Sequence, residues 1–304
     1  MIVAAGAESR LAWSVPDTGN GAEPAHHWGV TIGTSQPVLT LDKVSVTYAN
    51  GTAALQPLDL ALHPREVAVL LGPSGAGKST LLRTMNMLVP PTMGRVLRQD
   101  GVALQTTQQI RAHRRNTAMI FQQHQLIARM SALQNVLMGR LGKHSFWRTV
   151  LPFGPEERRL ALACLERVGM LDKALNRCDT LSGGQQQRVG IARALAQEPK
   201  IILADEPVAS LDPATASRVL LLLRAICRQD QIPAVISLHH IAYARAVADR
   251  IIGLAGGRVV FDDVPAKLSP EVLCAIYGDQ AVIDGDHDDS PSASVRLDPP
   301  GAFQ

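Results

Sequence analysis

The chain has 304 residues, of which 46% are hydrophobic and 19% charged, and its formal net charge is +3. This length and composition allow one large hydrophobic core or two smaller ones. Because no run of about 18 uncharged apolar residues is present, we expect no segment that spans a bilayer, and any membrane association to go through a partner. The four cysteines are widely spaced without a C-x-x-C pair, which indicates neither a zinc site nor a disulfide framework and favours a reducing cytosol.

The two ends of the chain differ from its middle in composition. Residues 1–37 lack apolar periodicity and lack the basic start and apolar core of a secretory signal, so we expect a disordered or loosely attached extension. Residues 279–304 are acidic and rich in Pro and Ser, and we expect a disordered tail. The sequence therefore predicts one folded domain over residues 38–278.

The first predicted elements are strands. Residues 39–41 and 44–48 alternate as strands do, and Asn50-Gly51 is a turn signal, so we expect a hairpin that forms an antiparallel layer. Tyr48 lies just before the turn, where its ring could either pack against a strand end or stack on a nucleotide base. The continuous apolar run 67–71 is typical of a strand buried on both faces of a parallel sheet.

The next stretch has the spacing G-x-x-x-x-G-K-[ST] of a loop that wraps phosphates, and a helix is predicted after it over residues 79–88. Glycines let the backbone fold tightly around an anion, and a helix N-terminus favours negative charge. Lys78 would reach the β- and γ-phosphates of a nucleotide, and the Ser79 hydroxyl would hold Mg²⁺. The predicted nucleotide-binding residues here are Gly72, Pro73, Ser74, Gly75, Ala76, Gly77, Lys78, Ser79 and Thr80.

Further strands and helices follow the phosphate loop. Residues 94–97 and 118–121 are strand-like, with Gln122 directly after the second strand. Apolar residues then repeat at helical intervals between about residues 124 and 182, which predicts an inserted helical subdomain. The basic residues cluster only at Arg111, His113, Arg114 and Arg115, which we interpret as the solvated face of a helix rather than a nucleic-acid site.

The second half of the chain contains another pair of buried strands with polar residues at their ends. Strand 201–205 ends in Asp205 and Glu206, and strand 233–238 is followed by His239. The carboxyl ends of parallel strands form the edge of the sheet where ligands bind. Asp212-Pro213 is a strong helix start, and segments 251–254 and 258–261 close the predicted sheet.

The segment Leu181-Ser182-Gly183-Gly184-Gln185 resembles the LSGGQ signature of ATP-binding-cassette (ABC) ATPases, and the other motifs fall into register with it over about residues 38–278. The resemblance implies an α/β P-loop NTPase core with an antiparallel β layer and an inserted α-helical subdomain. It also implies a role for each motif: Tyr48 for adenine stacking, residues 72–79 as the Walker A loop, Gln122 as the Q-loop glutamine, Asp205 as the Walker B aspartate, Glu206 as the catalytic carboxylate and His239 as the switch histidine. The adjacent His240 is the alternative for the last role.

The resemblance further implies how these groups act together. Lys78, Glu206, Gln122 and His239 would form the catalytic set, and Ser79, Gln122 and Asp205 would hold Mg²⁺ while ATP is hydrolysed. Ser182 and Gly184 would act on the nucleotide of a second copy, so that the active form is a homodimer. A groove beside the Q-loop would receive a membrane permease, with residues 128–135 as candidate contacts and with no part for nucleic acid.

Within this family the chain looks like the ATP-binding proteins of phosphonate importers. The similarity lies in the Q-loop region, in the run Ser145-Phe146-Trp147-Arg148-Thr149 and around Walker B. It implies a subunit on the cytoplasmic face of the inner membrane that works with a permease and, indirectly, with a substrate-binding protein. Two alternatives remain open, an ATPase accessory to a soluble carbon–phosphorus lyase complex and an importer ATPase for another small anion.

Overall fold

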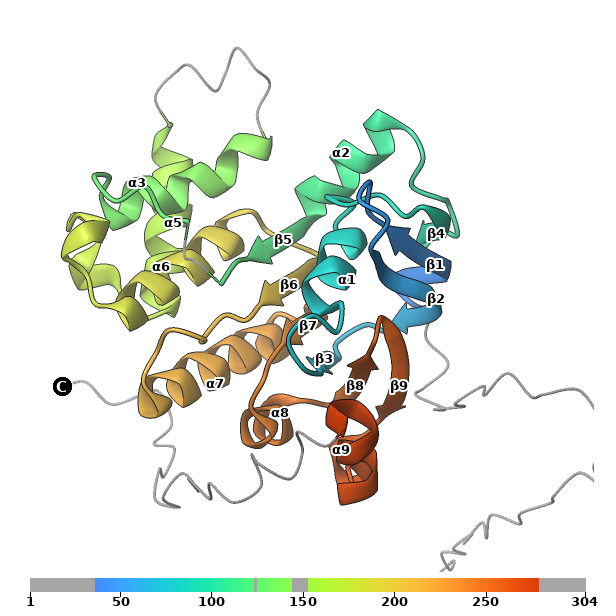
Figure 1. Cartoon of the computed structure of the whole chain (residues 1–304). Coiled ribbons are helices and arrows are strands. Elements are labelled where there is room, and N and C mark those ends of the chain that lie inside the picture. The colour runs from blue at the N-terminus through green and yellow to red at the C-terminus, as the bar shows by residue number, and fades with distance from the viewer. Residues whose placement is uncertain (1–35, 123–124, 144–152, 279–304) are drawn as a thin grey trace, which may run out of the picture.

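The computed structural model describes residues 36–122, 125–143 and 153–278. The expected acidic tail, the run 145–149 and all of the expected N-terminal extension except residues 36 and 37 lie outside the described residues. The described part contains two sheets with helices packed around them (Figure 1).

The larger sheet has the strand order β5-β6-β7-β3-β8-β9, and only the pair β8–β9 is antiparallel. Its central strands are buried on both faces, as the continuous apolar runs predict. Val67, Val69 and Leu71 of β3 pack into one hydrophobic core, whereas Ala68 and Leu70 pack into another. The strands are β3 (Val67–Leu71), β5 (Thr117–Ile120), β6 (Ile201–Asp205), β7 (Ala234–Ser237), β8 (Arg250–Ala255) and β9 (Arg258–Asp263).

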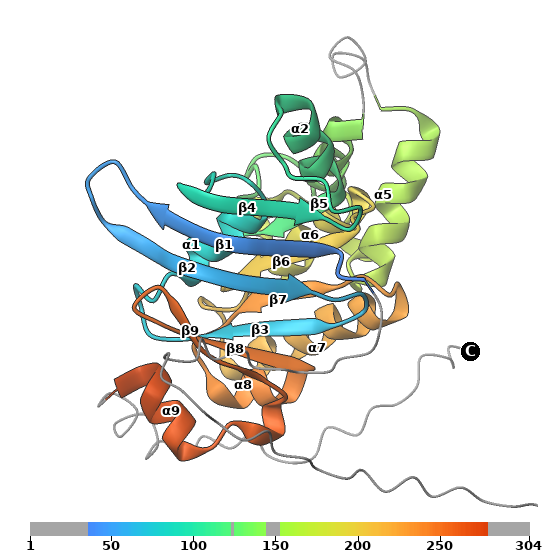
Figure 2. The ribbon, with the colours of Figure 1, turned by 90° about the vertical axis from the view of Figure 1, so that its right-hand side faces the viewer.

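The smaller sheet is the expected antiparallel layer, with the order β2-β1-β4 (Figure 2). The segments 39–41 and 44–48, predicted as separate, form the single strand β1 (Leu39–Thr47), which is irregular at Lys43, where φ is 49°. The turn at Asn50-Gly51 connects β1 to β2 (Ala53–Leu62), and β4 (Met93–Arg98) pairs with the other edge of β1. The sheet therefore places Tyr48 at the start of the turn.

Helix α1 (Lys78–Met85) lies between the two sheets and contacts β1 and β2 on one side and β6 and β7 on the other. It is shorter than the predicted helix over residues 79–88. Asn86 caps its C-terminus and Met87 has a φ of 56°, a left-handed conformation in which the helix cannot continue. Leu81, Leu82 and Met85 are fully buried, so packing fixes the helix that begins at the phosphate loop.

Helix α2 (Thr107–Asn116) corrects the interpretation of the basic cluster as a solvated face. Arg111, Arg114 and Arg115 are exposed, but His113 is buried and its Nε2 lies 2.8 Å from the carbonyl oxygen of Met85. Burial lowers the pKa of His113. Neutral His113 therefore packs α2 onto the end of α1.

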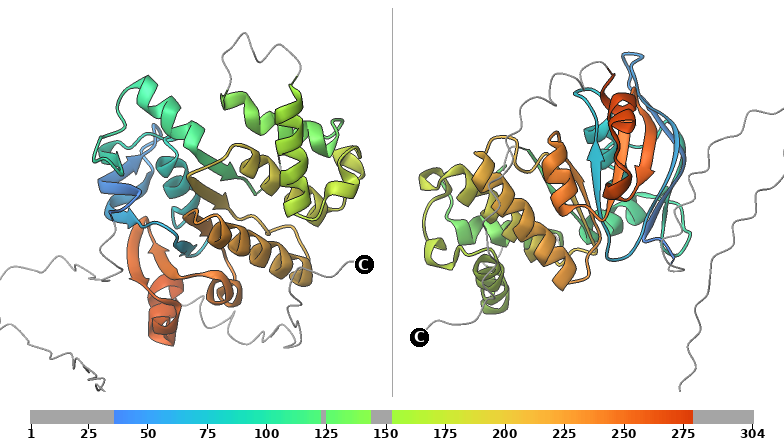
Figure 3. Two further views of the ribbon diagram at one scale, coloured as in Figure 1. Left: turned by 180° about the vertical axis from the view of Figure 1, so that it is seen from behind. Right: turned by 90° about the horizontal axis from the view of Figure 1, so that it is seen from below.

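The predicted helical insert is present and contains α3 (Ala132–Leu137) and α5 (Pro155–Arg167), after which the chain enters α6 (Gly183–Ala196). These helices lie on the side of the molecule away from the antiparallel layer (Figure 3). Short 3₁₀ helices connect them: η1 (Met138–Lys143), η2 (Leu171–Lys173) and η3 (Cys178–Thr180). Ala132 and Asn135 are fully buried, so these two members of the predicted permease contact 128–135 cannot meet a partner directly.

Three helices complete the described chain. Helix α7 (Pro213–Gln229) has the Asp212 cap expected from the sequence, with Asp212 Oδ1 accepting from the Thr215 amide at 2.9 Å. Helix α8 (Ile241–Val247) follows the histidines, and the 3₁₀ turn η4 (Pro265–Lys267) leads to α9 (Pro270–Tyr277), which packs on β8 and β9. The sequence analysis implied β2 through the hairpin turn without giving its range, and it did not predict α8 or α9.

Candidate nucleotide site

The phosphate loop joins β3 to α1 and requires glycine at two positions. Gly72 has a φ of 154°, and a Cβ there would lie 2.3 Å from the carbonyl oxygen of Leu254. Gly77 has a φ of 103°, and its Cβ would lie 2.7 Å from the carbonyl oxygen of Ala54. The N-terminus of α1 has no side-chain cap, so its backbone N–H groups can bind an anion.

Lys78 is held inside this loop. Its side chain is buried, and Nζ donates to the carbonyl oxygens of Gly72 at 2.6 Å and Pro73 at 3.0 Å. Burial lowers the pKa of Lys78, although the carboxylates of Glu206 and Asp205 oppose that shift. The Lys78 ammonium is thus held at the loop by two backbone carbonyl oxygens.

Tyr48 lies beside the same helix. Its hydroxyl is 3.1 Å from Oγ1 of Thr80, and the residue is 38% exposed. An exposed ring fixed through its hydroxyl can present a face for stacking. The structure therefore brings together Tyr48 and Thr80, which were both predicted to bind the nucleotide.

Asp205 and Ser79 meet directly. The Ser79 hydroxyl donates to Asp205 Oδ1 at 2.8 Å, and the carboxylate is buried at the end of β6. A third residue, Ser237 of β7, donates to the same oxygen at 3.0 Å and accepts from the amide of Glu206 at 2.8 Å. Sequence reasoning missed Ser237, although a polar residue that ends an otherwise apolar strand run was a visible signal.

Glu206 has a strained backbone and contacts His239, the predicted switch histidine. Its φ is 47°, a conformation that costs a non-glycine residue about 1–3 kcal/mol and often occurs at functional sites. Glu206 Oε1 lies 2.5 Å from His239 Nε2, whereas the ring of His240 packs edge-on against Tyr243 with a centroid separation of 5.4 Å. The geometry thus favours His239 over His240 as the partner of the carboxylate.

Gln122 lies at the same edge of the sheet. Strands β5 and β6 are parallel neighbours in which Ile120 pairs with Ala204, so Gln122 and Asp205 both leave the sheet at its carboxyl edge. The Gln122 side chain is exposed there. Its position fits the predicted Q-loop role, which depends on a bound nucleotide.

Ser182 and Gly184 lie elsewhere, on the helical side of the larger sheet. The Ser182 hydroxyl caps α6 by accepting from the Gln185 amide at 3.4 Å. A Cβ on Gly184 would lie 2.4 Å from Cγ2 of Thr215, so this glycine packs closely against the start of α7. In the contacts described, Ser182 and Gly184 meet α6 itself and the start of α7, and α6 packs against β5, α3, α5 and α7 rather than against α1.

Comparison with known proteins decides the family. Residues 55–209 match the family model described as ABC transporter. The chain belongs to the ABC transporter ATPase family. The family and the fold class expected from the motifs are therefore confirmed.

Several relatives of this ABC ATPase cover most of its length. It is 58% identical over 240 residues to the phosphite import ATP-binding protein PxtA of Stutzerimonas stutzeri, covering 79% of this chain and 87% of the relative. It is 52% identical over 255 residues to the phosphonates import ATP-binding protein PhnC 3 of Nostoc sp., covering 84% and 97% of the two chains. Among solved structures, the cassette MJ0796 in a dimeric post-hydrolysis state with ADP and Pi is similar, with a TM-score of 0.65, 36% identity and coverage of 75% and 98%.

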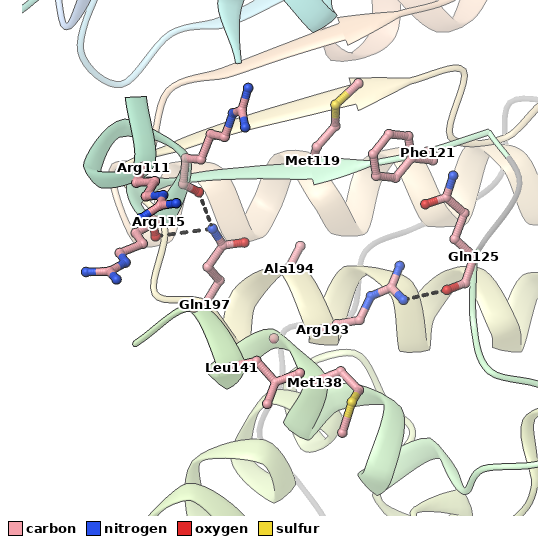
Figure 4. Close-up of a pocket in the computed structure, with 13 residues that line it drawn as sticks. Arg111, Arg115, Met119, Phe121, Gln125, Met138, Leu141, Arg193, Ala194 and Gln197 are labelled. Atoms are coloured by element: carbon pink, nitrogen blue, oxygen red, sulfur yellow. Dashed lines mark hydrogen bonds between the residues drawn. The ribbon is translucent and has the colours of Figure 1, made fainter. Parts of the chain in front are cut away.

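The ABC ATPase also has a groove of about 580 Å³ between the larger sheet and the helical insert (Figure 4). Arg193 of α6 donates from Nη1 to the carbonyl oxygen of Gln125 at 2.7 Å, which links α6 to the segment after the Q-loop. Arginines form much of the rim and apolar side chains lie between them, and none of the described lining residues is acidic. The lining includes Arg111, Arg114, Arg115, Arg193, Met119, Phe121, Met138 and Leu141.

In the part of the chain that the structure describes, no helix has both the length and the apolar character needed to cross a membrane.

Proposed function

We propose that this chain hydrolyses ATP to drive uptake of phosphonate- or phosphite-class anions through a membrane permease. The observation that carries the ATPase part is the contact of Glu206 with His239 next to the Ser79–Asp205 pair, which assembles phosphoryl-transfer groups at one edge of the sheet. The substrate class is supported by the identities of 58% and 52% to phosphite and phosphonate import subunits. Substrate choice itself would belong to other subunits.

The residues of the site divide the work of hydrolysis. The loop amides and Lys78 hold the phosphates and neutralise their charge, while Tyr48 stacks on the adenine. Glu206 orients or deprotonates the attacking water, and His239 and Gln122 respond to the γ-phosphate from the open edge of the sheet. The strained backbone at Glu206 keeps its carboxylate at the strand end, beside His239.

The donor set around Asp205 fits Mg²⁺. Mg²⁺ prefers hard oxygen ligands such as carboxylates, hydroxyls and phosphates, and the Ser79 hydroxyl and the buried Asp205 carboxylate lie 2.8 Å apart. Ser79, Asp205 and Gln122 would hold the ion. When bound, Mg²⁺ would neutralise charge on the β- and γ-phosphates.

Two copies of the chain would share two ATP molecules. Ser182 caps α6 and Gly184 packs against Thr215 of α7, and the similar cassette MJ0796 forms a dimer. The N-terminus of α6, where Ser182 and Gly184 lie, would bind the γ-phosphate of the partner copy's nucleotide. Each complete site would therefore require both subunits.

The permease would dock in the groove of Figure 4. Its apolar floor and arginine rim suit a short permease helix with an apolar face and acidic ends. Because α6 forms one wall and continues from the signature residues, closure around ATP would move the permease. The chain would then be a peripheral subunit on the cytoplasmic face of the membrane, with the substrate-binding protein as an indirect partner.

Purification with partners tests the proposal. The tagged chain, isolated from detergent-solubilised membranes of its own cells, should recover a permease, and the complex should hydrolyse ATP only with Mg²⁺ present. Recovery with a soluble carbon–phosphorus lyase complex and without a permease would contradict the importer function.

A further inference from the structure

The loop that carries His239 is short and is held from two sides. It contains only Leu238, His239 and His240, between the end of β7 and the start of α8. On one side, the amide of Leu238 donates to the carbonyl oxygen of Leu70 at 3.0 Å, which fixes the loop to β3. The side chain of His240, the N-cap of α8, makes no capping hydrogen bond and so does not fix the loop.

The second interaction that fixes this loop comes from α9, the last described helix. The hydroxyl of Tyr277 on α9 donates to the carbonyl oxygen of His239 at 3.3 Å, across 38 residues of sequence. A phenol can donate one hydrogen bond, and a backbone carbonyl oxygen can accept it. The bond therefore acts on the peptide unit that carries the switch imidazole.

The position of Tyr277 is fixed by its neighbour in α9. Ile276 is 1% exposed and fills the space over Gly253 of β8, where a Cβ would lie 2.5 Å from Ile276 Cδ1. Gly253 pairs with Leu71, the last residue of β3 before the phosphate loop. The close packing of Ile276 on β8, next to β3, thus fixes α9 and with it the position of the Tyr277 hydroxyl.

We propose that Tyr277 is a positioning residue for ATP hydrolysis: its hydroxyl holds the His239 peptide so that the imidazole stays against Glu206. A shift of the backbone by a few tenths of an ångström would lengthen the contact of 2.5 Å between His239 Nε2 and Glu206 Oε1. Tyr277 would act on hydrolysis through His239 and leave nucleotide binding alone, because Tyr48 and the phosphate loop lie on other elements. The proposal depends on the ATPase activity and is independent of the transported substrate.

Tyr277→Phe in the purified full chain tests this position. The ring remains and only the hydroxyl is lost, so we expect kcat for ATP hydrolysis to fall about three- to tenfold, the range of one hydrogen bond, with an unchanged KM for ATP. Tyr243→Phe is the matched control, because its hydroxyl also donates to a carbonyl oxygen at 3.3 Å, that of Pro213, without touching the His239 peptide. The control should keep wild-type kcat.

A double-mutant comparison separates positioning from packing. In a His239→Ala background Tyr277→Phe should have no further effect on kcat, because the side chain that it positions is gone. An equal fall in both backgrounds, an unchanged kcat in Tyr277→Phe alone, or a rise in KM would overturn the proposal. A large loss of thermal stability in Tyr277→Phe together with loss of nucleotide binding would assign the residue to the fold and equally overturn it. Failure of wild-type ATPase activity would instead contradict the proposed function.

Discussion

Glu206 and His239 lie at the ends of strands β6 and β7, and their side chains meet with Oε1 and Nε2 2.5 Å apart. The contact joins residues that are 33 positions apart in the sequence. Ser237 stabilises the same arrangement, since its hydroxyl donates to the Asp205 carboxylate and accepts from the Glu206 amide. The ends of the two strands are therefore joined to each other by side-chain hydrogen bonds.

Replacing the carboxylate should separate hydrolysis from binding. In Glu206→Gln we expect the turnover of ATP to fall by about 10²–10⁴, because an amide cannot accept the proton of the attacking water. The affinity for ATP should persist, since Lys78 and the loop amides are unchanged. Steady-state ATPase assays and equilibrium nucleotide binding measure the two quantities.

Glu156→Gln is the control for that experiment, because Glu156 is exposed on α5 and pairs only with the nearby Arg159 among the described ion pairs. It should retain wild-type turnover. Full activity in Glu206→Gln would remove Glu206 from the mechanism.

Gly184 tests the packing of the signature helix on α7. In Gly184→Ala the new Cβ would lie 2.4 Å from Thr215 Cγ2, so we expect a loss of about 1–3 kcal/mol in unfolding free energy from overpacking. Adding Thr215→Ser removes that methyl group but keeps the hydroxyl, and should restore the stability. Denaturant unfolding of the single and double variants measures both effects.

ATP hydrolysis in the same variants tests the role of Gly184 toward a second copy. If Gly184 faces the partner copy's nucleotide, the double variant should remain impaired in hydrolysis although its stability has returned. Recovery of full ATPase activity along with the stability would argue against a direct contact of Gly184 with nucleotide.

The groove arginines should contribute to permease binding and not to ATP hydrolysis. Arg111 and Arg115 are exposed at the rim, so Arg111→Glu with Arg115→Glu should weaken co-purification of the permease at least tenfold. The turnover of the isolated chain should not change. Arg159→Glu reverses an exposed charge outside the groove and should leave permease binding intact. Unaltered permease recovery in the groove variant would place the docking surface elsewhere.

The four cysteines should differ in reactivity. Burial raises the pKa of Cys164 to about 11 and that of Cys227 to about 12, and it also raises the pKa of Cys178, whereas Cys274 is exposed. Because the thiolate is the reactive form, the folded chain at pH 8 should react rapidly at Cys274 alone. Thiol titration of wild type and Cys274→Ser checks this, with all four thiols of the wild type reacting in denaturant. Rapid labelling of a second thiol in the folded chain would contradict the described packing.

The sequence predicted the fold best where a motif imposes its own backbone. The phosphate loop needs glycine at Gly72 and Gly77, and the apolar run of β3 is typical of a strand buried on both faces, so both features could be predicted from the sequence. Contacts between elements that are distant in the sequence could not be predicted. His113 looked like part of a basic surface because its burial depends on where α1 ends.

The site shows the same division. Asp205, Glu206 and His239 were placed correctly at strand ends, but the link through Ser237 requires the pairing of β6 with β7. The positive φ of Glu206 and the hold of Tyr277 on His239 likewise arise from tertiary packing. Asn135 was expected near a partner, yet it is buried, where its side chain bonds the backbone of Ile127.

Uptake of labelled phosphite and methylphosphonate by intact cells is the most direct test of the central claim. Cells that lack this chain should fail to accumulate either anion, the wild-type chain should restore uptake of at least one of them, and Glu206→Gln should not restore it although the protein is present at the membrane. Equal uptake with and without the chain, or uptake restored fully by Glu206→Gln, would contradict the account.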